Sequence, residues 1–456
     1  MATPRILILR TRRGRGRSMR LIRAALVLVT TSVAGTVSAP AQEIAAGTRP
    51  HGVTVKLDSQ SPTSGIQEAI EELGTDGGVV TIPPGDYLLR QSIRVRSHVT
   101  LQGSGQKTVL RKGKQLGSKL AAEGDAESRS IRVENTAGFR KGDEIGIFDR
   151  TTVGWLHGHA IVKAVRGNEL LLDRRLGRAF GPANGAAVIN YFPAITGQGL
   201  SKVLLKDLTI DGRAEDNPGP AVVSAREKRK PPDLGFTFAA INLLEMTDGR
   251  IEGCRINGWP ADGISLQKGV RNLVTKCVVL NCRGPGYHAG GRETDSEFSD
   301  NEARGNHGDG FYFCAWVTRA RVMNNKFIGN KENGIGGLGD SGDIDNIVED
   351  NLCQENALCG IALWDGSSNT VKNNTCVNNS QASPGQWSGI LLSKTEKSVV
   401  SGNRCFDDQK TKTQKHGIEE LADCRENTIT DNDCRGNSRA GLALAGKDGT
   451  RSGNRE

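Results

Sequence analysis

Side chains that could take up and release protons are concentrated in three short segments, PADGIS, GPGYHAGG and HGDGFYFC. These segments contain Asp262, His288, Asp309 and Tyr312, and Arg292 follows His288 by four residues. Carboxyl, imidazole and phenol groups serve as general acids and bases, and a guanidinium neutralises a nearby anion. The set therefore suits removal of a proton next to a carboxylate, whereas the two aspartates alone would suit hydrolysis.

The chain around these segments repeats with a period of about two dozen residues. Runs of Val, Ile and Leu separate the turns, and the apolar residues show no helical spacing. This pattern predicts a solenoid whose coils each have about three short strands and stack about 4.8 Å apart. A recurring glycine marks the period, at Gly263, Gly286, Gly310, Gly334, Gly360, Gly389, Gly417 and Gly441.

Strand alternation predicts which of these side chains share a surface. The residue after each marker glycine points inward, so the next residue points outward. His288 and Tyr312 should therefore be outward neighbours about 5 Å apart, on adjacent coils. Asp262 and Asp309 precede marker glycines two coils apart, which places them about 9–10 Å from each other at the edge of the strand. The corresponding outward residues of later coils are Gly336 and Ala362, so the polar cluster is local.

The same face supplies candidate substrate-binding residues, because a polysaccharide groove needs hydrogen-bonding groups and aromatic rings. These are Asn242, Ser265, Gln267, Trp316 and Trp364, with Leu338 expected in the same outward column as Gln267 and Trp364. Each functional residue also has a structural alternative. Asp262 and Asp309 could accept backbone hydrogen bonds in turns, His288 could be a hydrogen-bonded surface residue, and the aromatic rings could pack a loop.

Two buried columns are expected to hold the coils in register. The first is an asparagine ladder at a turn, made of Asn257, Asn306, Asn330, Asn356, Asn379 and Asn437. The second is a column of small apolar sites, made of Cys254, Cys277, Cys353, Cys376, Cys405 and Cys434. Core packing is the simplest role for these cysteines, and disulfides between adjacent coils remain an alternative.

The N-terminal part of the sequence predicts an export signal and a cap. Residues 1–41 contain eight arginines, a short apolar stretch and small residues at a cleavage site, which predicts a removable leader and a secreted or periplasmic protein. Ser64 is expected to be the N-cap of a short amphipathic helix, with Gln67 completing a capping box. Outside the leader, basic and acidic residues nearly balance, so no nucleic-acid partner is predicted.

The segments GGVVTIPPGDY and VTLQGSG that follow this helix resemble the start of right-handed β-helix proteins of the pectate-lyase superfamily. The resemblance implies an all-β protein, a single right-handed parallel β-helix (solenoid) with an N-terminal capping helix. Strand-like segments between Gln115 and Phe192 interrupt the repeat and predict a small β insertion. We expect a leader at 1–41, the cap and first coils at 42–114, the insertion at 115–192 and the main β-helix at 193–456. That superfamily includes polysaccharide lyases, polygalacturonase-like hydrolases and mannuronan C5-epimerases.

The resemblance does not select one reaction. PADGIS is similar to the NTDG strand of polygalacturonases, with Asp262 as the matching residue, but these coils lack the adjacent Asp-Asp pair, the GHG and the RIK of that family. The DPH tripeptide of the epimerases is also missing. The first hypothesis is a lyase or epimerase acting on an extracellular, uronate-containing polysaccharide, with His288 and Tyr312 as acid and base and Arg292 neutralising the carboxylate. The alternatives are an inverting hydrolase using Asp262 and Asp309, and a non-catalytic glycan-binding surface protein.

No cofactor is required by any of these hypotheses, and no metal ligand set is assigned. Calcium is left open by the segment GDSGDID, in which Asp340, Asp343 and Asp345 resemble a calcium loop in composition. No membrane partner is expected after removal of the leader, and the sequence predicts no particular oligomeric state.

Overall fold

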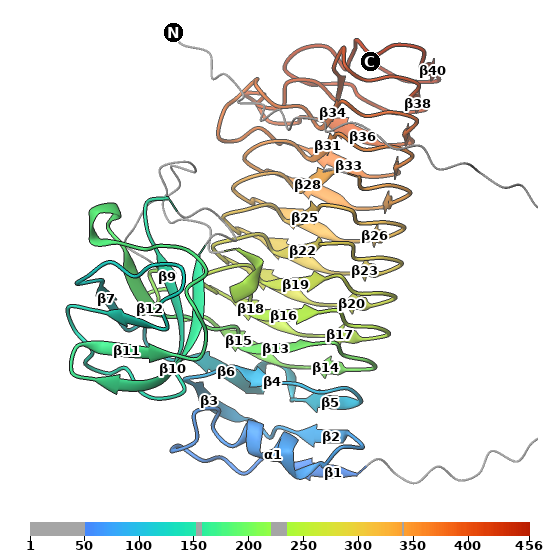
Figure 1. Cartoon of the computed structure of the whole chain (residues 1–456). Helices are drawn as coiled ribbons and strands as arrows, with labels where there is room; N and C mark the ends of the chain where they lie inside the picture. Colours follow the sequence, from blue (N-terminus) through green and yellow to red (C-terminus); the bar gives the residue numbers. More distant parts are fainter. Residues whose placement is uncertain (1–50, 152–156, 220–234, 340–341) are drawn as a thin grey trace, which may run out of the picture. The chain divides into compact units, whose positions relative to one another are not determined.

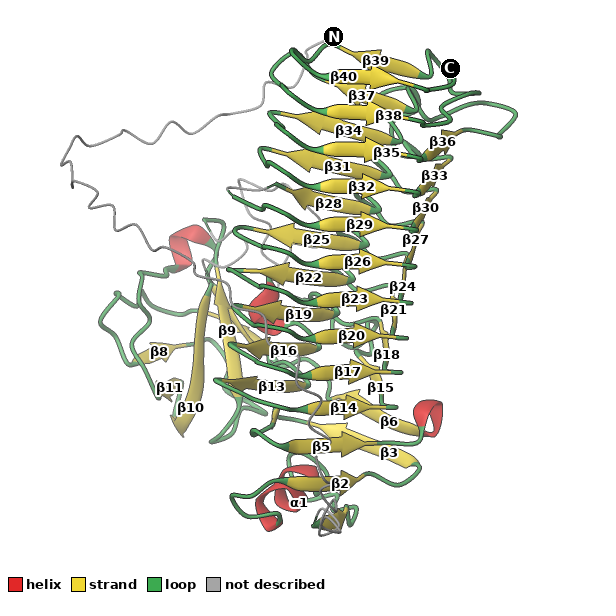
Figure 2. Cartoon of the chain, turned by 90° about the vertical axis from the view of Figure 1, so that its right-hand side faces the viewer, coloured by secondary structure: helices red, strands yellow, loops and turns green. Residues whose placement is uncertain are grey.

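The protein is a right-handed parallel β-helix, as the repeat predicts. A computed structural model describes residues 51–151, 157–219, 235–339 and 342–456. The expected leader at 1–41 lies outside the described residues. Three long parallel sheets run along the helix, and most coils contribute one strand to each sheet in turn (Figures 1 and 2). No helix of the described residues is long and apolar enough to span a membrane.

The strands are short because each coil must turn three times within about two dozen residues. Sheet A contains β1 (Gly52–Thr54), β2 (Gly78–Thr81), β5 (Val99–Gln102), β14 (Leu204–Lys206), β17 (Arg250–Glu252), β20 (Leu273–Thr275), β23 (Glu297–Ser299), β26 (Arg321–Met323), β29 (Ile347–Glu349), β32 (Thr370–Lys372), β35 (Val399–Ser401), β38 (Thr428–Thr430) and β40 (Thr450–Ser452). Sheet B contains β3 (Gly85–Leu89), β6 (Thr108–Lys112), β15 (Thr209–Asp211), β18 (Arg255–Asn257), β21 (Val278–Leu280), β24 (Glu302–Arg304), β27 (Lys326–Ile328), β30 (Leu352–Gln354), β33 (Thr375–Val377) and β36 (Arg404–Phe406).

The third sheet carries the outward column of interest. Sheet C contains β4 (Ile93–Arg94), β13 (Ile195–Gln198), β16 (Ile241–Leu244), β19 (Ile264–Gln267), β22 (Tyr287–Gly290), β25 (Phe311–Cys314), β28 (Ile335–Leu338), β31 (Ile361–Trp364), β34 (Ile390–Ser393), β37 (Ile418–Glu420) and β39 (Leu442–Leu444). Its inward residues, such as Ile264, Tyr287 and Phe311, are fully buried. The inward and outward alternation predicted from the marker glycines is therefore correct for these strands.

A separate antiparallel sheet forms the β insertion between β6 and β13. Its strands, in sheet order, are β7 (Gly117–Lys119), β12 (Ala187–Asn190), β9 (Glu144–Phe148), β10 (Gly158–Arg166), β11 (Glu169–Leu172) and β8 (Ser130–Arg132). The insertion has its own apolar core, and it replaces the turn that leads from sheet B to sheet C in that coil. The described residues also contain three 3₁₀ turns: η1 (Gly105–Lys107), η2 (Pro182–Asn184) and η3 (Phe236–Phe238).

The N-terminal helix α1 (Ile66–Glu72) lies beside β1 and β2 at the start of the solenoid (Figure 1). Its buried side chains are Ile66, Ala69 and Ile70, so the predicted apolar stripe does cover the first coil. The predicted cap is wrong in detail. Gly65 occupies the N-cap in a left-handed conformation, and the hydroxyl of Ser64 donates instead to the carbonyl of Leu88. The backbone N–H of Gln67 donates to Thr63 Oγ1, which takes the capping role expected of Ser64.

Buried asparagines line the turn between sheets B and C, as predicted. The amide side chain of Asn356 donates to Asn379 Oδ1 at 3.0 Å and to the carbonyl of Phe327 at 3.0 Å. Its own Oδ1 accepts from both nitrogens of Asn330. The same pattern runs from Asn306 through Gln414 to Asn437. Each side chain thus satisfies backbone groups that the turn would otherwise leave buried and unpaired.

Asn257 is not part of this ladder, because Cys254 and Cys277 belong to a different turn from the other cysteines of the predicted column. Strand register aligns Cys277 with Asn301, whose side chain accepts from the backbone N–H of Cys277 at 2.9 Å. Both turns need a buried residue that can pair with backbone, so their sequences look alike. Cys353, Cys376, Cys405 and Cys434 do share a column in the core. All ten cysteines are free thiols, and burial raises the pKa of the Cys376 and Cys405 thiols.

We expect Asn356→Ala to lower the free energy of unfolding by about 2–4 kcal/mol, because each buried group left without a partner costs about 1–3 kcal/mol. Urea denaturation followed by circular dichroism measures this change. The exposed Asn168, for which no side-chain hydrogen bond is recorded among the described residues, provides the matched control Asn168→Ala. Equal midpoints for the two variants would mean that the ladder does not stabilise the stack.

Candidate functional site

The candidate site lies on the outer face of sheet C, where β19, β22 and β25 are adjacent. Strand pairing aligns Ser265 with His288 and His288 with Tyr312, and the next residue of the column is Gly336. The predicted outward column is therefore present. Its polar part stops at Tyr312, because the glycines of β28 follow it.

A buried ion pair forms the centre of the site. Nδ1 of His288 donates to Oδ2 of Asp262 at 2.7 Å, and the two side chains are only 7% and 1% exposed. Burial alone would lower the pKa of His288, but the hydrogen bond to Asp262 and the nearby charges of Asp262 and Cys314 raise that pKa to about 10. His288 is therefore a cation over the whole neutral range, and Asp262 is its counter-ion.

Gly284 makes room for this pair. A Cβ atom at Gly284 would lie 2.0 Å from Oδ1 of Asp262, so any larger residue would displace the carboxylate. The Asp262 side chain leaves the edge of its own coil and reaches the outward column of the next one. Asp309 does the same two coils later, where a Cβ at Gly336 would lie 2.5 Å from its Oδ2. The repeat thus presents a carboxylate to the outward column twice, with an imidazole above the first and a glycine above the second.

Aromatic rings surround the imidazole. The rings of His288 and Tyr312 meet edge to face with centroids 5.0 Å apart, and Phe236 of η3 approaches His288 at 5.7 Å. Gly337 permits the position of the Tyr312 ring, because a Cβ there would lie 2.6 Å from Cε2. The predicted proximity of His288 and Tyr312 is present in the structure. Phe236 was not predicted, because η3 lies in a turn whose path no repeat specifies.

The segment that carries Phe236 is held by the β insertion. Phe238 packs edge to face on Tyr191, with centroids 4.5 Å apart, and its carbonyl accepts a hydrogen bond from the indole of Trp259 at 2.7 Å. Thr237 accepts a hydrogen bond from the side chain of Asn242 at 3.1 Å. The insertion therefore supports η3, which forms a wall of the site. No described side chain of the insertion itself makes a hydrogen bond or a ring contact with His288.

Arg292 lies in the turn that follows β22, and the next residue, Glu293, is a buried carboxylate. Glu293 accepts hydrogen bonds from the backbone N–H of Gly269 at 2.6 Å, from the Asn272 amide at 2.9 Å and from the Ser296 hydroxyl at 2.7 Å. Burial raises the pKa of Glu293. The guanidinium of Arg292 lies over the ring of Trp316, 5.5 Å from its centroid.

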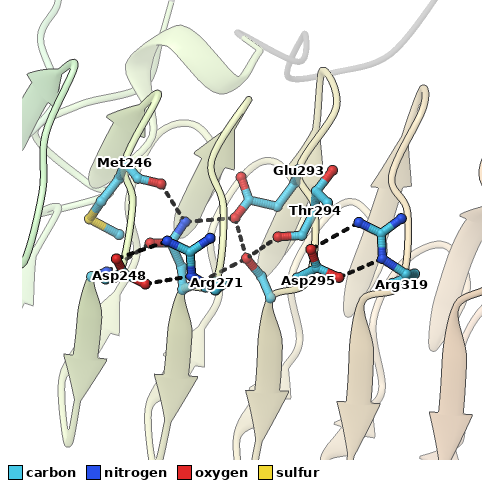
Figure 3. Close-up of polar contacts among 10 residues, drawn as sticks. Met246, Asp248, Arg271, Glu293, Thr294, Asp295 and Arg319 are labelled. Atoms are coloured by element: carbon cyan, nitrogen blue, oxygen red, sulfur yellow. Dashed lines mark hydrogen bonds and ion pairs between the residues drawn. The ribbon is translucent and has the colours of Figure 1, made fainter. Parts of the chain in front are cut away.

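Surface ion pairs flank the same row of turns. Arg271 pairs with Asp248 at 2.7 Å and Arg319 pairs with Asp295 at 2.6 Å, both on exposed side chains (Figure 3). Such pairs contribute little to stability. These pairs hold the neighbouring Arg271 and Arg319, whereas Arg292 has no carboxylate partner among the described residues.

The remaining predicted binding residues divide into two groups. Asn242, Ser265 and Gln267 are at most 5% exposed and lie in the covered part of the face, where the Gln267 amide donates to Ser265 Oγ at 3.0 Å. Trp316 and Trp364 are 50% and 39% exposed and can meet a ligand directly.

Asp309 and Leu338 complete the set of predicted positions. Oδ1 of Asp309 accepts from the backbone and side-chain nitrogens of Asn333 at 2.7 and 2.9 Å. The outward position predicted for Leu338 is wrong. A register shift at the glycines of β28 aligns Leu338 with Leu363 and buries its side chain.

The described residues do not provide a set of ligands for the calcium site left open by the sequence. Asp340 lies outside them, and Asp343 is buried, with its carboxylate accepting the backbone N–H groups of Val317 at 2.7 Å and Gly339 at 3.1 Å. Asp343 therefore has a turn-forming role. In the part of the chain that the structure describes, no group of three or more His, Cys, Asp or Glu side chains could hold a metal ion.

The comparisons with known proteins agree with the fold. The family model described as "Right handed beta helix region" matches residues 236–352, and the one described as "Periplasmic copper-binding protein (NosD)" matches residues 335–454. The sequence has no significant match among curated proteins. The chain is thus a right-handed parallel β-helix, and residues 236–352 match the model of that fold.

Two similar solved structures are the A-modules of the Azotobacter vinelandii mannuronan C-5 epimerases AlgE6 and AlgE4. They are 14% and 15% identical to this chain, with TM-scores of 0.52 and 0.51. Both matches cover 86% of this chain, and they cover 94% and 96% of the respective modules. At this identity the likeness concerns the fold alone.

The copper named in the second family description does not fit the residues of the matched segment. His416 is buried, and its Nδ1 lies 3.0 Å from the carbonyl oxygen of Ala440, with which it is paired. The thiols of Cys353, Cys376 and Cys405 are enclosed among apolar side chains of the core. Copper would need accessible imidazole or thiolate ligands. The described residues of this segment therefore do not form a copper site.

The raised pKa of His288 predicts a pH-dependent stability. Because the folded-state pKa is about 10 and the ordinary value is 6.5, the folded chain binds one proton more than the unfolded chain between these two pH values. This contribution is complete below about pH 6.5 and is lost as the pH rises through about 10, at up to about 1.4 kcal/mol per pH unit. Urea denaturation of the wild type and His288→Gln across this range should show a steeper decline for the wild type. Parallel curves would contradict the ion pair.

Proposed function

We propose that this protein is exported and acts on a uronate-containing polysaccharide, by removing the proton next to the uronate carboxylate. The result is β-elimination, or C5 epimerisation if the proton returns to the opposite face. The observation that carries the proposal is the buried Asp262–His288 pair with the Tyr312 ring packed against it. The similarity to structures named mannuronan C-5 epimerases supports the same class of substrate.

His288 serves as the general acid in this proposal. Its pKa of about 10 keeps a proton on the imidazole at neutral pH, ready for transfer to the leaving glycosidic oxygen. Asp262 fixes the ring orientation and keeps the proton donor charged, in the way that a buried carboxylate orients a catalytic histidine. Because both side chains are almost fully buried, water screens the attraction between them poorly, and Asp262 keeps the imidazolium charged.

Tyr312 serves as the base, and Arg292 neutralises the carboxylate. The phenol lies on the strand adjacent to His288, so one sugar unit can reach both rings. Abstraction of the C5 proton places negative charge on the uronate carboxylate, and a guanidinium stabilises that charge. The exposed ring of Trp316 beneath Arg292 offers a stacking surface for a neighbouring sugar.

Export rests on the predicted leader at 1–41 and is supported by the periplasmic protein named in the second family description. A secreted or periplasmic location would bring the chain into contact with extracellular polysaccharides.

The proposal is tested with polymannuronate, polyguluronate, polygalacturonate and neutral glucans, in D₂O as well as in H₂O. A lyase releases unsaturated ends that absorb in the ultraviolet, and an epimerase introduces deuterium at C5, which NMR detects. We expect His288→Gln and Tyr312→Phe to lose about 10²–10⁴-fold in kcat, as is usual on removal of a general acid or base. Activity of the wild type should persist in alkaline solution and fall as the pH approaches about 10, where His288 loses its proton.

Two further variants distinguish loss of the Asp262–His288 pair from general damage to the fold. Gly284→Ala should displace the Asp262 carboxylate and lower kcat without changing any reacting group. His307→Gln changes an exposed histidine of a neighbouring turn and should retain wild-type activity. New reducing ends without ultraviolet absorbance or deuterium, lost in Asp262→Asn and Asp309→Asn, would instead establish the inverting hydrolase. Binding of intact glycans without any reaction would establish the binding protein.

A further inference from the structure

Cys314 differs from every other cysteine of the chain in its exposure. The other nine cysteines are buried, whereas Cys314 is half-exposed at the end of β25. It lies two residues beyond Tyr312 and therefore faces outward on the same side of sheet C. Core packing accounts for the buried thiols, but it does not account for one that faces the candidate site.

Cys314 is also a neighbour of His288. Strand register aligns His288 with Tyr312 and Gly290 with Cys314. His288 and Cys314 are therefore diagonal neighbours on adjacent strands, with Cα atoms about 7–8 Å apart, so their side chains can reach each other. The interaction with Cys314 is one of the causes of the raised pKa of His288. Gly290 leaves this approach open, because a Cβ there would lie 3.0 Å from the Cβ of Cys314.

The imidazole of His288 is positioned to act as the base for this thiol. Nδ1 of His288 is bonded to Asp262, and the opposite nitrogen, Nε2, is buried without a hydrogen-bond partner among the described residues. A buried ring nitrogen needs a partner, because an unpaired polar atom costs free energy. The carboxylate, the imidazole and the thiol thus follow one another in the order that nucleophilic catalysis requires, with the base oriented by a third group.

We propose that Cys314 is the nucleophile of an Asp262–His288–Cys314 triad that cleaves carboxylic esters, such as O-acetyl groups carried by a polysaccharide. The inference does not rest on the uronate chemistry proposed above, although it uses the same imidazole. The sulfur, with its proton transferred to His288, attacks the ester carbonyl carbon. The carbon–oxygen bond then breaks, His288 gives its proton to the departing alcohol, and an acyl-thioester remains on Cys314. Water hydrolyses the thioester, which releases the carboxylic acid and restores the thiol.

Arg292 can stabilise the oxyanion of this reaction. Its backbone N–H donates to the carbonyl of Ala315, the residue after Cys314, at 3.2 Å. The backbone of Arg292 is thus held next to the residue that follows Cys314, and its guanidinium lies above the ring of Trp316. A positive charge at this position stabilises negative charge that develops on the ester oxygen.

The test uses the full chain and p-nitrophenyl acetate, with acetylated and deacetylated xylan as polymeric substrates. We expect acetyl-Cys314 to accumulate in the first turnover, as detected by intact mass and peptide mapping, and hydroxylamine to remove it. Cys314→Ala should abolish the adduct, and His288→Gln should slow its formation by about 10²-fold or more. His307→Gln should leave the rate unchanged.

Thiol reactivity gives an independent readout. Iodoacetamide near neutral pH should label Cys314 before any other cysteine, and at least about tenfold more slowly in His288→Gln. Equal labelling rates in the two proteins, or no acetyl adduct on Cys314, would overturn the triad. Loss of uronate activity in Cys314→Ala without acetylation would also overturn it, since Cys314 would then only position His288. Failure of the uronate assays with a positive acetylation result would refute the proposed function and leave the triad standing.

Discussion

Backbone hydrogen bonding between successive coils is the constraint on which everything else in this protein depends. Each coil donates and accepts along all three sheets, so a residue has a defined neighbour in the coil before and in the coil after. A lone coil could not bury its inward side chains, and the stack therefore forms as one cooperative core. The register of the site is a direct consequence, because His288 can meet Tyr312 only if β22 and β25 pair without a shift.

The corners of the coils impose a second requirement. A chain that turns three times in each coil leaves backbone groups without strand partners inside the structure. Asparagine satisfies them at more than one corner, through ladders such as Asn301–Asn325–Asn351 and Asn306–Asn330–Asn356. These ladders hold the coils rigidly, which is what a site built from side chains of separate coils needs.

The site itself departs from the rule that buried side chains are apolar. A buried ion pair such as Asp262–His288 seldom adds to stability, because desolvation offsets the attraction between the charges. Its retention on one face of an otherwise regular solenoid is consistent with a chemical role, as perturbed pKa values and buried charges cluster at functional sites. Phe238 of η3 packs on Tyr191 at the end of the β insertion, and Phe236 of the same turn contacts the imidazole. A fold that repeats can thus hold a single site at the place where its repeat is interrupted.

Much of this arrangement is already determined by the sequence alone. The recurring glycine specifies the period, strand alternation specifies which side chains point outward, and together they bring His288, Tyr312 and Asp262 into one region, because sheet geometry allows no other register. Other features were decided only by the tertiary structure. The assignment of Cys254 and Cys277 to their corner, the burial of Leu338, the contact of Phe236 with His288 and the approach of Cys314 to the same ring depend on turn paths and side-chain rotamers. The alternation of side chains along a strand carries no information about turn paths or rotamers. The contacts of Phe236 and Cys314 with His288 therefore follow from packing between coils and not from the repeat.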